Sequence, residues 1–288
     1  MMVANTYVKA HGVADKAVGR GQPPLELRVG SLLDLDVKRR DRPNEDSLFV
    51  AQDIQSSISV PAKPFALFVV ADGMGGHTNG QEVSQLAIAS LVESMYASLR
   101  SKQMTPDTLL PLLVEGVQQA NQVVYRRNQE RGTTMGTTMT TTLVSGTTAY
   151  VANVGDSRTY RYRPSSGLSQ ITRDHSLVAA LVQAGVIKPD DIYTHPRRNQ
   201  IYRSLGEKPT VEVDTFVVPL TDGDTLLLCS DGLWEMVHDP QIASIVTNAQ
   251  VDPSTMANRL VQAALAGGGA DNVSVIVVRV RKTQDGLS

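Results

Sequence analysis

Two long segments of the chain repeat apolar residues every three or four positions, which is the period of an amphipathic helix. They cover residues 81–100 and 105–129 and contain few residues that break a helix. Shorter segments of the same kind cover residues 176–184 and 253–266. We therefore expect two long helices that lie together against a sheet, and two short helices elsewhere.

Short runs of β-branched and apolar residues, bounded mostly by Gly, Pro, Asp or Ser, predict the β-strands. The runs are residues 47–51, 65–71, 138–145, 149–154, 158–162, 211–218, 225–229 and 272–280. Strands dominate both ends of the chain, and the two long helices come between them as one block. This order predicts an α+β fold with mainly antiparallel sheets, and not an alternating α/β fold.

The ends of the chain differ from its middle. Residues 1–25 show no sustained period and finish in a turn-prone Gly-Gln-Pro-Pro stretch, so we expect a flexible N-terminal arm there. One domain is expected over residues 26–283, followed by a short C-terminal tail over 284–288. Residues 185–210 are rich in polar residues and Pro, which predicts an exposed excursion near a functional surface.

Composition narrows the class of function. Apolar residues make up 41% of the chain and charged residues 19%, as in an ordinary globular protein with a buried core. Lys and Arg number 27 against 29 Asp and Glu, and this balance provides no basic field for nucleic acid or an anionic membrane. No stretch resembles a signal peptide or a membrane span. We expect a cytoplasmic protein with neither nucleic acid nor membrane as a partner.

Acidic residues occur where the predicted strands begin or end. They are Glu45 and Asp46, Asp72, Asp156, Asp231 and Asp271. Strand ends can converge on one rim of a sheet, and buried carboxylates are costly unless a cation neutralises them. One Asp beside a strand is usually a turn former, but so many together favour a metal cluster. Oxygen ligands indicate a hard cation, Mg²⁺ or Mn²⁺.

Other chemistries are excluded by the residues present. The Gly-rich stretch 72–77 lacks the Lys and the Ser or Thr of a P-loop. An EF-hand at residues 34–36 fails because Lys38 and Arg39 take the places of a ligand and the turn glycine. The single cysteine, Cys229, has no arginine within the next six positions, which excludes a cysteine phosphatase loop. No GxSxG elbow is present for a serine hydrolase.

Eight motifs in order resemble those of the bacterial type-2C metal-dependent protein phosphatases, the PPM family. They are RPNEDS, FVVADGMGGH, GTTMTTTLV, VGDSRTYRYR, ITRDHSLV, IYRSLGE, CSDGLWEMV and GGADNVSVIVV, and they cover roughly residues 30–281. The resemblance implies a central antiparallel β-sandwich flanked by helices on both faces, in four α-β-β-α layers. It also implies that the domain over 26–283 is a Ser/Thr phosphatase catalytic domain with two Mn²⁺ or Mg²⁺ ions.

The resemblance assigns roles to the acids. It implies that Asp72 bridges both ions, that Gly73 offers its backbone carbonyl, and that Asp231 and Asp271 complete the ligands of one ion. Asp46 belongs to the same cluster, Glu45 acts through water, and Asp156 binds a third, weaker ion. The implied mechanism is direct attack on phosphorus by a hydroxide that bridges the two ions, without a phosphoenzyme.

The phosphate-binding arginine departs from the family pattern. The family places it five residues before the aspartate of NED, where this chain has Asp41 between Arg40 and Arg42. Either guanidinium suits bidentate phosphate binding, and we favour Arg42 because Pro43 holds its backbone extended. The alternative is that both are solvated surface charges.

Two further features of the site are open at this stage. His77 follows the Gly-rich stretch and is a candidate acid for the leaving alcohol, although a structural role in the loop is an equal alternative. Residues 185–203 correspond to the variable flap of similar phosphatases.

The resemblance implies that the partners are phosphorylated proteins, including targets of Ser/Thr kinases or the kinase itself, and that the chain is a monomer. The alternative is a catalytically weak relative that only binds phosphoproteins or a kinase.

Overall fold

The first of two sheets is built around a strand that is buried along most of its length. The computed structural model describes residues 8–9, 25–35, 43–54, 64–75, 78–101 and 104–283. Every residue from Phe65 to Ala71 is buried, because alternate side chains face the helices on one side and the second sheet on the other. The seven strands are β1 (Val8–Lys9), β3 (Asp46–Ile54), β4 (Phe65–Met74), β6 (Met139–Ser145), β7 (Thr148–Val154) and β10 (Asp214–Pro219) in spatial order, with β5 (Gly136–Thr137) on β4.

The second sheet has five strands and packs face to face on the first. Its spatial order is β2 (Leu25–Asp34), β12 (Val273–Lys282), β11 (Thr225–Cys229), β8 (Arg158–Arg163) and β9 (Gly167–Gln170). All its pairs are antiparallel, and among the pairs of the first sheet only β1 with β3 is parallel in the described ranges. Buried side chains such as Phe68, Val151 and Ile276 fill the space between the two sheets.

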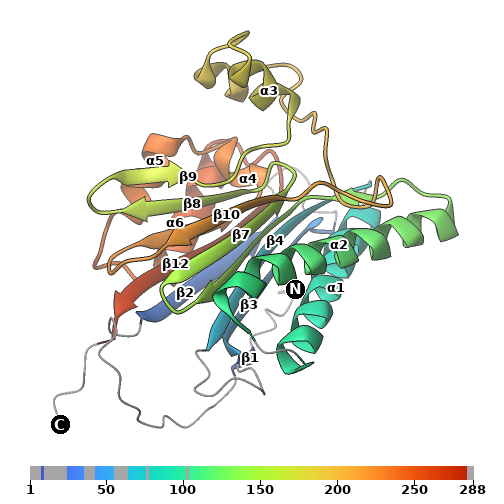
Figure 1. Ribbon diagram of the computed structural model, residues 1–288. Helices are drawn as coiled ribbons and strands as arrows, with labels where there is room; N and C mark the ends of the chain where they lie inside the picture. The colour runs from blue at the N-terminus through green and yellow to red at the C-terminus, as the bar shows by residue number, and fades with distance from the viewer. Residues whose placement is uncertain are drawn as a thin grey trace.

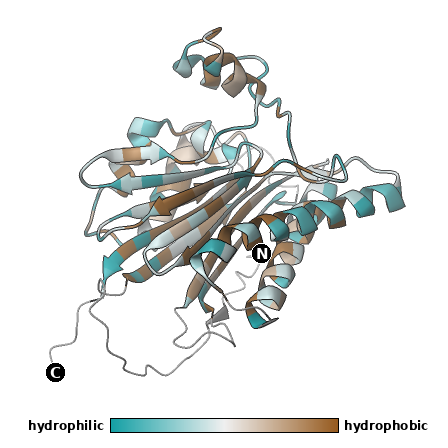
Figure 2. Ribbon diagram, in the orientation of Figure 1, coloured by the Kyte–Doolittle hydropathy of each residue, from teal (hydrophilic) through white to brown (hydrophobic). Residues whose placement is uncertain are grey.

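Helices cover both outer faces of the sandwich (Figure 1). Helices α1 (Thr78–Ser101) and α2 (Pro106–Arg131) pack on the first sheet. Helices α4 (Asp231–Trp234), α5 (Asp239–Val246) and α6 (Pro253–Ala266) pack on the second. Figure 2 shows hydrophobic residues concentrated on the strands and hydrophilic ones on much of α2. The predicted α+β sandwich with helices on both faces is confirmed.

The flap, residues 185–203, projects from one end of the sandwich together with α3 (Leu177–Gln183) (Figure 1). It contains the short 3₁₀-helix η1 (Pro189–Tyr193) and leaves two large apolar side chains exposed, Val186 and Tyr202. The flap therefore stands apart from the core, as expected for an excursion near a functional surface.

Element boundaries follow the predicted ones closely in the long segments. Helix α6 and strand β11 have the predicted limits, while α1 begins three residues earlier than expected. Of the predicted flexible arm, Val8–Lys9 lies beside β3 and most other residues fall outside the described ranges, so this prediction and the domain limits stay predictions. No helix in the described part of the chain is long and apolar enough to cross a membrane.

Candidate metal centre

Antiparallel pairing of β3 and β4 brings the first two acids together. The register places Asp46 directly opposite Asp72, at the start of one strand and near the end of the other. The backbone of Asp72 is fixed on both sides, because its N–H donates to Thr138 Oγ1 at 3.0 Å and its carbonyl accepts from Thr138 N–H at 2.9 Å. Both carboxylates therefore lie at one rim of the first sheet.

The second sheet brings its acids to the same rim. Asp231 follows β11 and is the first residue of α4, while Asp271 and Asn272 precede β12. Asn272 Oδ1 accepts a hydrogen bond from Glu45 N–H at 2.8 Å, which joins the entry of β12 to the entry of β3. At Gly232 a Cβ atom would lie 2.0 Å from the carbonyl oxygen of Asn272, so only glycine permits this approach.

Serine side chains orient the buried carboxylate of Asp46. Ser230 Oγ donates to Asp46 Oδ2 at 2.7 Å, and Ser230 Oγ itself accepts from Ser274 N–H at 3.0 Å. Asp46 is 4% exposed. Its orientation is thus set by Ser230, which follows β11, and by β12 through Ser274, across the interface between the sheets.

Gly73 lies where the backbone is packed most tightly. A Cβ atom at this position would lie 1.9 Å from the carbonyl oxygen of Gly80 in α1 and 2.8 Å from that of Glu45. Gly73 N–H donates to the Glu45 carbonyl at 3.1 Å. Only glycine therefore fits at this position, where the backbone of β4 packs directly against the backbone of α1.

Burial and mutual repulsion disfavour the charged form of these acids. Burial raises the pKa of Asp46 to about 6, although the hydrogen bond from Ser230 opposes the shift. Burial also raises the pKa of Asp72 well above its usual range, and the charges of Asp231, Asp46, Asp271 and Asp156 raise it further. The electrostatic influence of each acid on the others shows that they form one cluster.

Asp156 joins this cluster from the turn between β7 and β8. Burial raises its pKa to about 7, and the negative charge of Asp174 adds to the shift. Its backbone carbonyl accepts a hydrogen bond from Trp234 Nε1 at 3.0 Å. The Arg158 guanidinium stacks 3.7 Å from the centre of the Trp234 ring and forms an ion pair with Asp174 at 2.6 Å.

The donor set fits a pair of hard divalent cations. Asp231 Oδ1 is buried and has no hydrogen-bond partner within the described residues, which is costly unless a cation lies against it. Among the same residues, no group of three acidic, His or Cys side chains is arranged to hold a metal ion. The carboxylates therefore form an open cluster, and like charges that repel one another gain from a shared cation.

One acid of this rim escaped the sequence analysis. Glu235 lies one helical turn after Asp231; burial raises its pKa, and its charge raises that of Asp231. Its Oε2 accepts from Arg198 Nε of the flap at 3.3 Å. The spacing of four residues from Asp231 on a helix was the available signal. The other candidates, Arg40, Arg42 and His77, lie outside the described residues.

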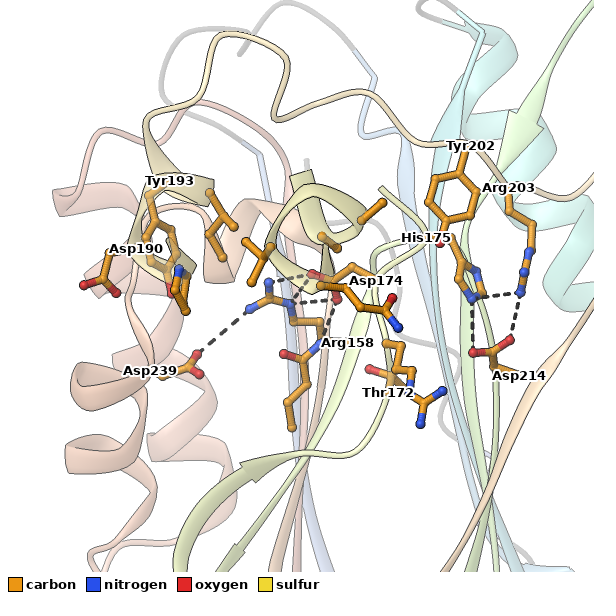
Figure 3. A pocket seen from close by; sticks show the side chains of 18 of the residues that line it. Arg158, Thr172, Asp174, His175, Asp190, Tyr193, Tyr202, Arg203, Asp214 and Asp239 are labelled. Atoms are coloured by element: carbon orange, nitrogen blue, oxygen red, sulfur yellow. Dashed lines mark hydrogen bonds and ion pairs between the residues drawn. The ribbon is translucent and has the colours of Figure 1, made fainter. Parts of the chain in front are cut away.

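A cavity of about 1090 Å³ lies between the flap and the sandwich (Figure 3). The aspartates at positions 46, 72, 231 and 271 do not line it. Arg158, Asp174 and His175 do line it, and each lies close to the turn that carries Asp156. The cavity is therefore a separate feature that adjoins one side of the acid cluster.

The β-sandwich with carboxylates at one rim and the matches to known proteins place the chain among the metal-dependent phosphatases. The family model described as protein phosphatase 2C matches residues 37–266. The chain belongs to the protein phosphatase 2C family.

Relatives in several bacteria are similar to this chain. The serine/threonine phosphatase Stp of Listeria monocytogenes is 37% identical over 222 residues, which are 76% of this chain and 86% of that protein. The serine/threonine protein phosphatase PstP of Mycobacterium tuberculosis is 38% identical over 262 residues, or 89% of this chain and 45% of that protein.

Solved structures of such proteins have the same fold. The catalytic domain of PstP in complex with two manganese ions aligns with a TM-score of 0.74 at 34% identity, covering 89% of this chain and 99% of that one. The serine/threonine phosphatase Stp1 of Staphylococcus aureus aligns with a TM-score of 0.78 at 30% identity, covering 91% and 99%.

Proposed function

We propose that the acid cluster holds the two divalent cations of a protein serine/threonine phosphatase. The chain is a metal-dependent phosphatase of phosphoserine and phosphothreonine in proteins, and its cofactors are two Mn²⁺ or Mg²⁺ ions. Asp46, Asp72 and Asp231 lie together at one rim, and Asp231 Oδ1 is buried without a hydrogen-bond partner in the described ranges. The site assignment rests on this observation.

We assign the ligands as follows. Asp72 holds both ions, Gly73 contributes its carbonyl oxygen, and Asp231 and Asp271 hold one ion, with Asp46 in the same cluster, Glu45 acting through water, and Asp156 at a third ion. The bound ions supply positive charge for the phosphoryl oxygens and lower the pKa of water. Ser230 holds the Asp46 carboxylate by a hydrogen bond, and the tight packing at Gly73 fixes the position of its backbone.

We propose the phosphate-binding residue and the proton donor from among residues that lie outside the described ranges. Arg42 or Arg40 binds the substrate phosphate, supported by the match of the neighbouring NED motif and by the fork geometry of a guanidinium. His77 protonates the leaving oxygen. We expect Arg42→Ala to raise KM more than it lowers kcat; an unchanged KM would transfer the role to Arg40.

The partners are phosphorylated proteins. We propose that they include targets of Ser/Thr kinases or a kinase itself, and that the chain works as a monomer in the cytoplasm. We propose that neither nucleic acid nor a membrane is a partner. The formal charge of -2 supports this, because it gives the protein no basic field that would attract them.

Hydrolysis of a phosphothreonine peptide in Mn²⁺, in Mg²⁺ and in chelator tests the site. We expect activity with either ion and none in chelator, and a loss of at least about 100-fold in Asp72→Asn and Asp231→Asn, since each change removes a charged ligand. Asp107→Asn is the matched control, because Asp107 is an exposed acid in the first turn of α2.

Two results would overturn the assignment. Activity that survives chelation, or that survives both substitutions, is incompatible with a metal centre built from these acids. The alternative function, a catalytically weak relative that binds phosphoproteins or a kinase, predicts Mn²⁺-dependent retention of the phosphopeptide without release of phosphate.

A further inference from the structure

His175 is a buried histidine that the acid cluster does not include. It is 2% exposed and lies in the loop between β9 and α3. Its ring Nδ1 accepts a hydrogen bond from Gly155 N–H at 3.0 Å, and its own backbone N–H donates to the Gly155 carbonyl at 3.0 Å. Both polar groups of Gly155, the residue before Asp156, are thus held by one residue.

The other ring nitrogen faces the end of the flap. His175 Nε2 lies 3.4 Å from Asp214 Oδ2 and 2.9 Å from Arg203 Nη1, and Arg203 Nη1 in turn lies 2.8 Å from Asp214 Oδ1 (Figure 3). Tyr202 N–H donates to the His175 carbonyl at 2.9 Å. The end of the flap therefore contacts the sandwich at the His175 side chain.

The donors and acceptors fix the state of the imidazole. Nδ1 must be unprotonated because Gly155 offers it a hydrogen, so the proton of the neutral ring is on Nε2, which lies 3.4 Å from Asp214 Oδ2. Burial lowers the pKa of His175, and the positive charge of Arg203 lowers it further, which favours this neutral form. Arg203 Nη1 donates to Asp214 Oδ1, and His175 Nε2 lies beside both of these groups.

The hydrogen bonds to Gly155 matter because its backbone adopts a conformation that few other residues could take. Gly155 has a φ of 100°, a conformation that other residues rarely adopt, and a Cβ there would lie 2.6 Å from the side chain of Thr138. Asn153 Nδ2 also reaches the Gly155 carbonyl, at 3.2 Å. The direction in which Asp156 leaves this turn therefore depends on hydrogen bonds made by its neighbours.

We propose that His175 is a positioning residue that fixes the Gly155–Asp156 turn through Nδ1 and ties this turn to the end of the flap through Nε2. The affinity of the Asp156 site for a divalent cation and the order of the flap then depend on the same side chain. This inference rests on the proposed role of Asp156 as a ligand of a third ion.

Two substitutions separate the two ring contacts. In His175→Asn the amide oxygen takes the place of Nδ1 and keeps the bond from Gly155, whereas in His175→Gln the longer amide reaches the place of Nε2 and the Nδ1 acceptor is lost. We expect His175→Gln to weaken the weakest Mn²⁺ site by about 10-fold or more, as the loss of supporting residues around metal ligands commonly does. His175→Asn should keep that affinity within about twofold.

Calorimetric titration with Mn²⁺ measures these affinities without using activity, and hydrogen exchange reports on the contacts in metal-free protein. His175→Gln should speed amide exchange in residues 153–157, while His175→Asn should speed it in residues 199–204 and leave 153–157 protected. His195→Gln is the matched control, since His195 Nδ1 also accepts a backbone N–H, from Arg197 at 3.1 Å within the flap.

The outcomes distinguish the inference from the proposed function. Asp156→Asn should remove the third Mn²⁺ site; if it does not, the role of Asp156 is wrong and the inference falls with it. If Asp156→Asn removes that site and His175→Gln leaves affinity and exchange unchanged, the positioning role alone is refuted. Should His175→Gln fail to fold, Asp214→Ala serves instead, and equal exchange of residues 199–204 in this variant and in the unsubstituted protein overturns the link to the flap.

Discussion

Raising the pH of the metal-free protein from 5 to 7 should lower its free energy of unfolding. Burial raises the pKa of Asp46 to about 6 and that of Asp156 to about 7, from the ordinary value of 3.8 for an aspartate. Between pH 3.8 and these values the folded protein binds protons that the unfolded chain has released. The stability that these carboxyls contribute is therefore present at acid pH and is lost as pH rises through their folded pKa values.

The size of the loss follows from these shifts. One pKa unit corresponds to about 1.4 kcal/mol, so between pH 5 and pH 7 Asp46 accounts for about 1.4 kcal/mol and Asp156, which is only half ionised at pH 7, for about 2.3 kcal/mol. His175 acts in the opposite direction: its pKa is lowered by burial and by Arg203, so its contribution grows as pH rises towards 6.5. The raised pKa values of Asp72 and Asp231 act in the same direction as those of Asp46 and Asp156. The net loss of at least about 2 kcal/mol is a large share of the stability of a typical domain.

Urea unfolding in chelator at pH 5, 6, 7 and 8 measures this slope, and the same series with Mn²⁺ provides the comparison. We expect the decline in chelator to vanish or reverse with Mn²⁺, because bound cations favour the charged carboxylates. Asp156→Asn should flatten the decline in chelator, since an amide does not titrate. A metal-free protein whose stability is constant or rises between pH 5 and 7, or an undiminished slope in Asp156→Asn, would refute the reasoning.

Three further changes test the packing around the site. Gly73→Ala should destabilise the protein by more than about 3 kcal/mol in urea unfolding and abolish phosphatase activity, because its Cβ would meet the Gly80 carbonyl at 1.9 Å. Gly132→Ala should cost only about 1 kcal/mol with activity unchanged, since a φ of 64° is its only obstacle and nothing lies within 4 Å of the added carbon. Arg158→Met should cost about 3 to 5 kcal/mol by leaving Asp174 buried and unpaired, and the double variant with Asp174→Leu should recover at least half of that in the same assay.

The acid cluster was predictable because it depends on local rules. Each acid adjoins a run of residues with strand character, and antiparallel pairing brings the ends of neighbouring strands to one rim. In the structure, the antiparallel pairing of β3 and β4 places Asp46 directly opposite Asp72, as this rule predicts. The resemblance then identified the individual residues, and the structure brings them to the same place.

Strand β2 shows why part of the fold could not be predicted. Its sequence is interrupted by Gly30 and Ser31, which weaken the strand pattern. Gly30 is there because the start of α6 presses on it: a Cβ would lie 2.2 Å from the backbone of Pro253 and Ser254. The reason for this glycine lies more than 200 residues away in the sequence, so no local pattern contains it.

Contacts between distant side chains were equally hidden. Trp234 is buried, and its indole also donates to the Asp156 carbonyl and stacks on Arg158. His175 holds the turn before Asp156 through Gly155, which lies 20 residues earlier along the chain. Residue type alone predicts that such groups need partners, and only the fold decides which partners they find.

The division of the acids between two sheets links the stability of this protein to its chemistry. Asp46 and Asp72 belong to the first sheet, whereas Asp231 and Asp271 adjoin strands of the second. The repulsion between these carboxylates therefore acts across the interface between the sheets, and the apolar layer in that interface opposes it. A cation shared by these carboxylates would replace that repulsion by attraction at the same rim. Substitutions that loosen the apolar layer far from the rim should therefore weaken Mn²⁺ binding, and Mn²⁺ should stabilise such variants less than the unsubstituted protein by the same free energy, since the coupling is reciprocal.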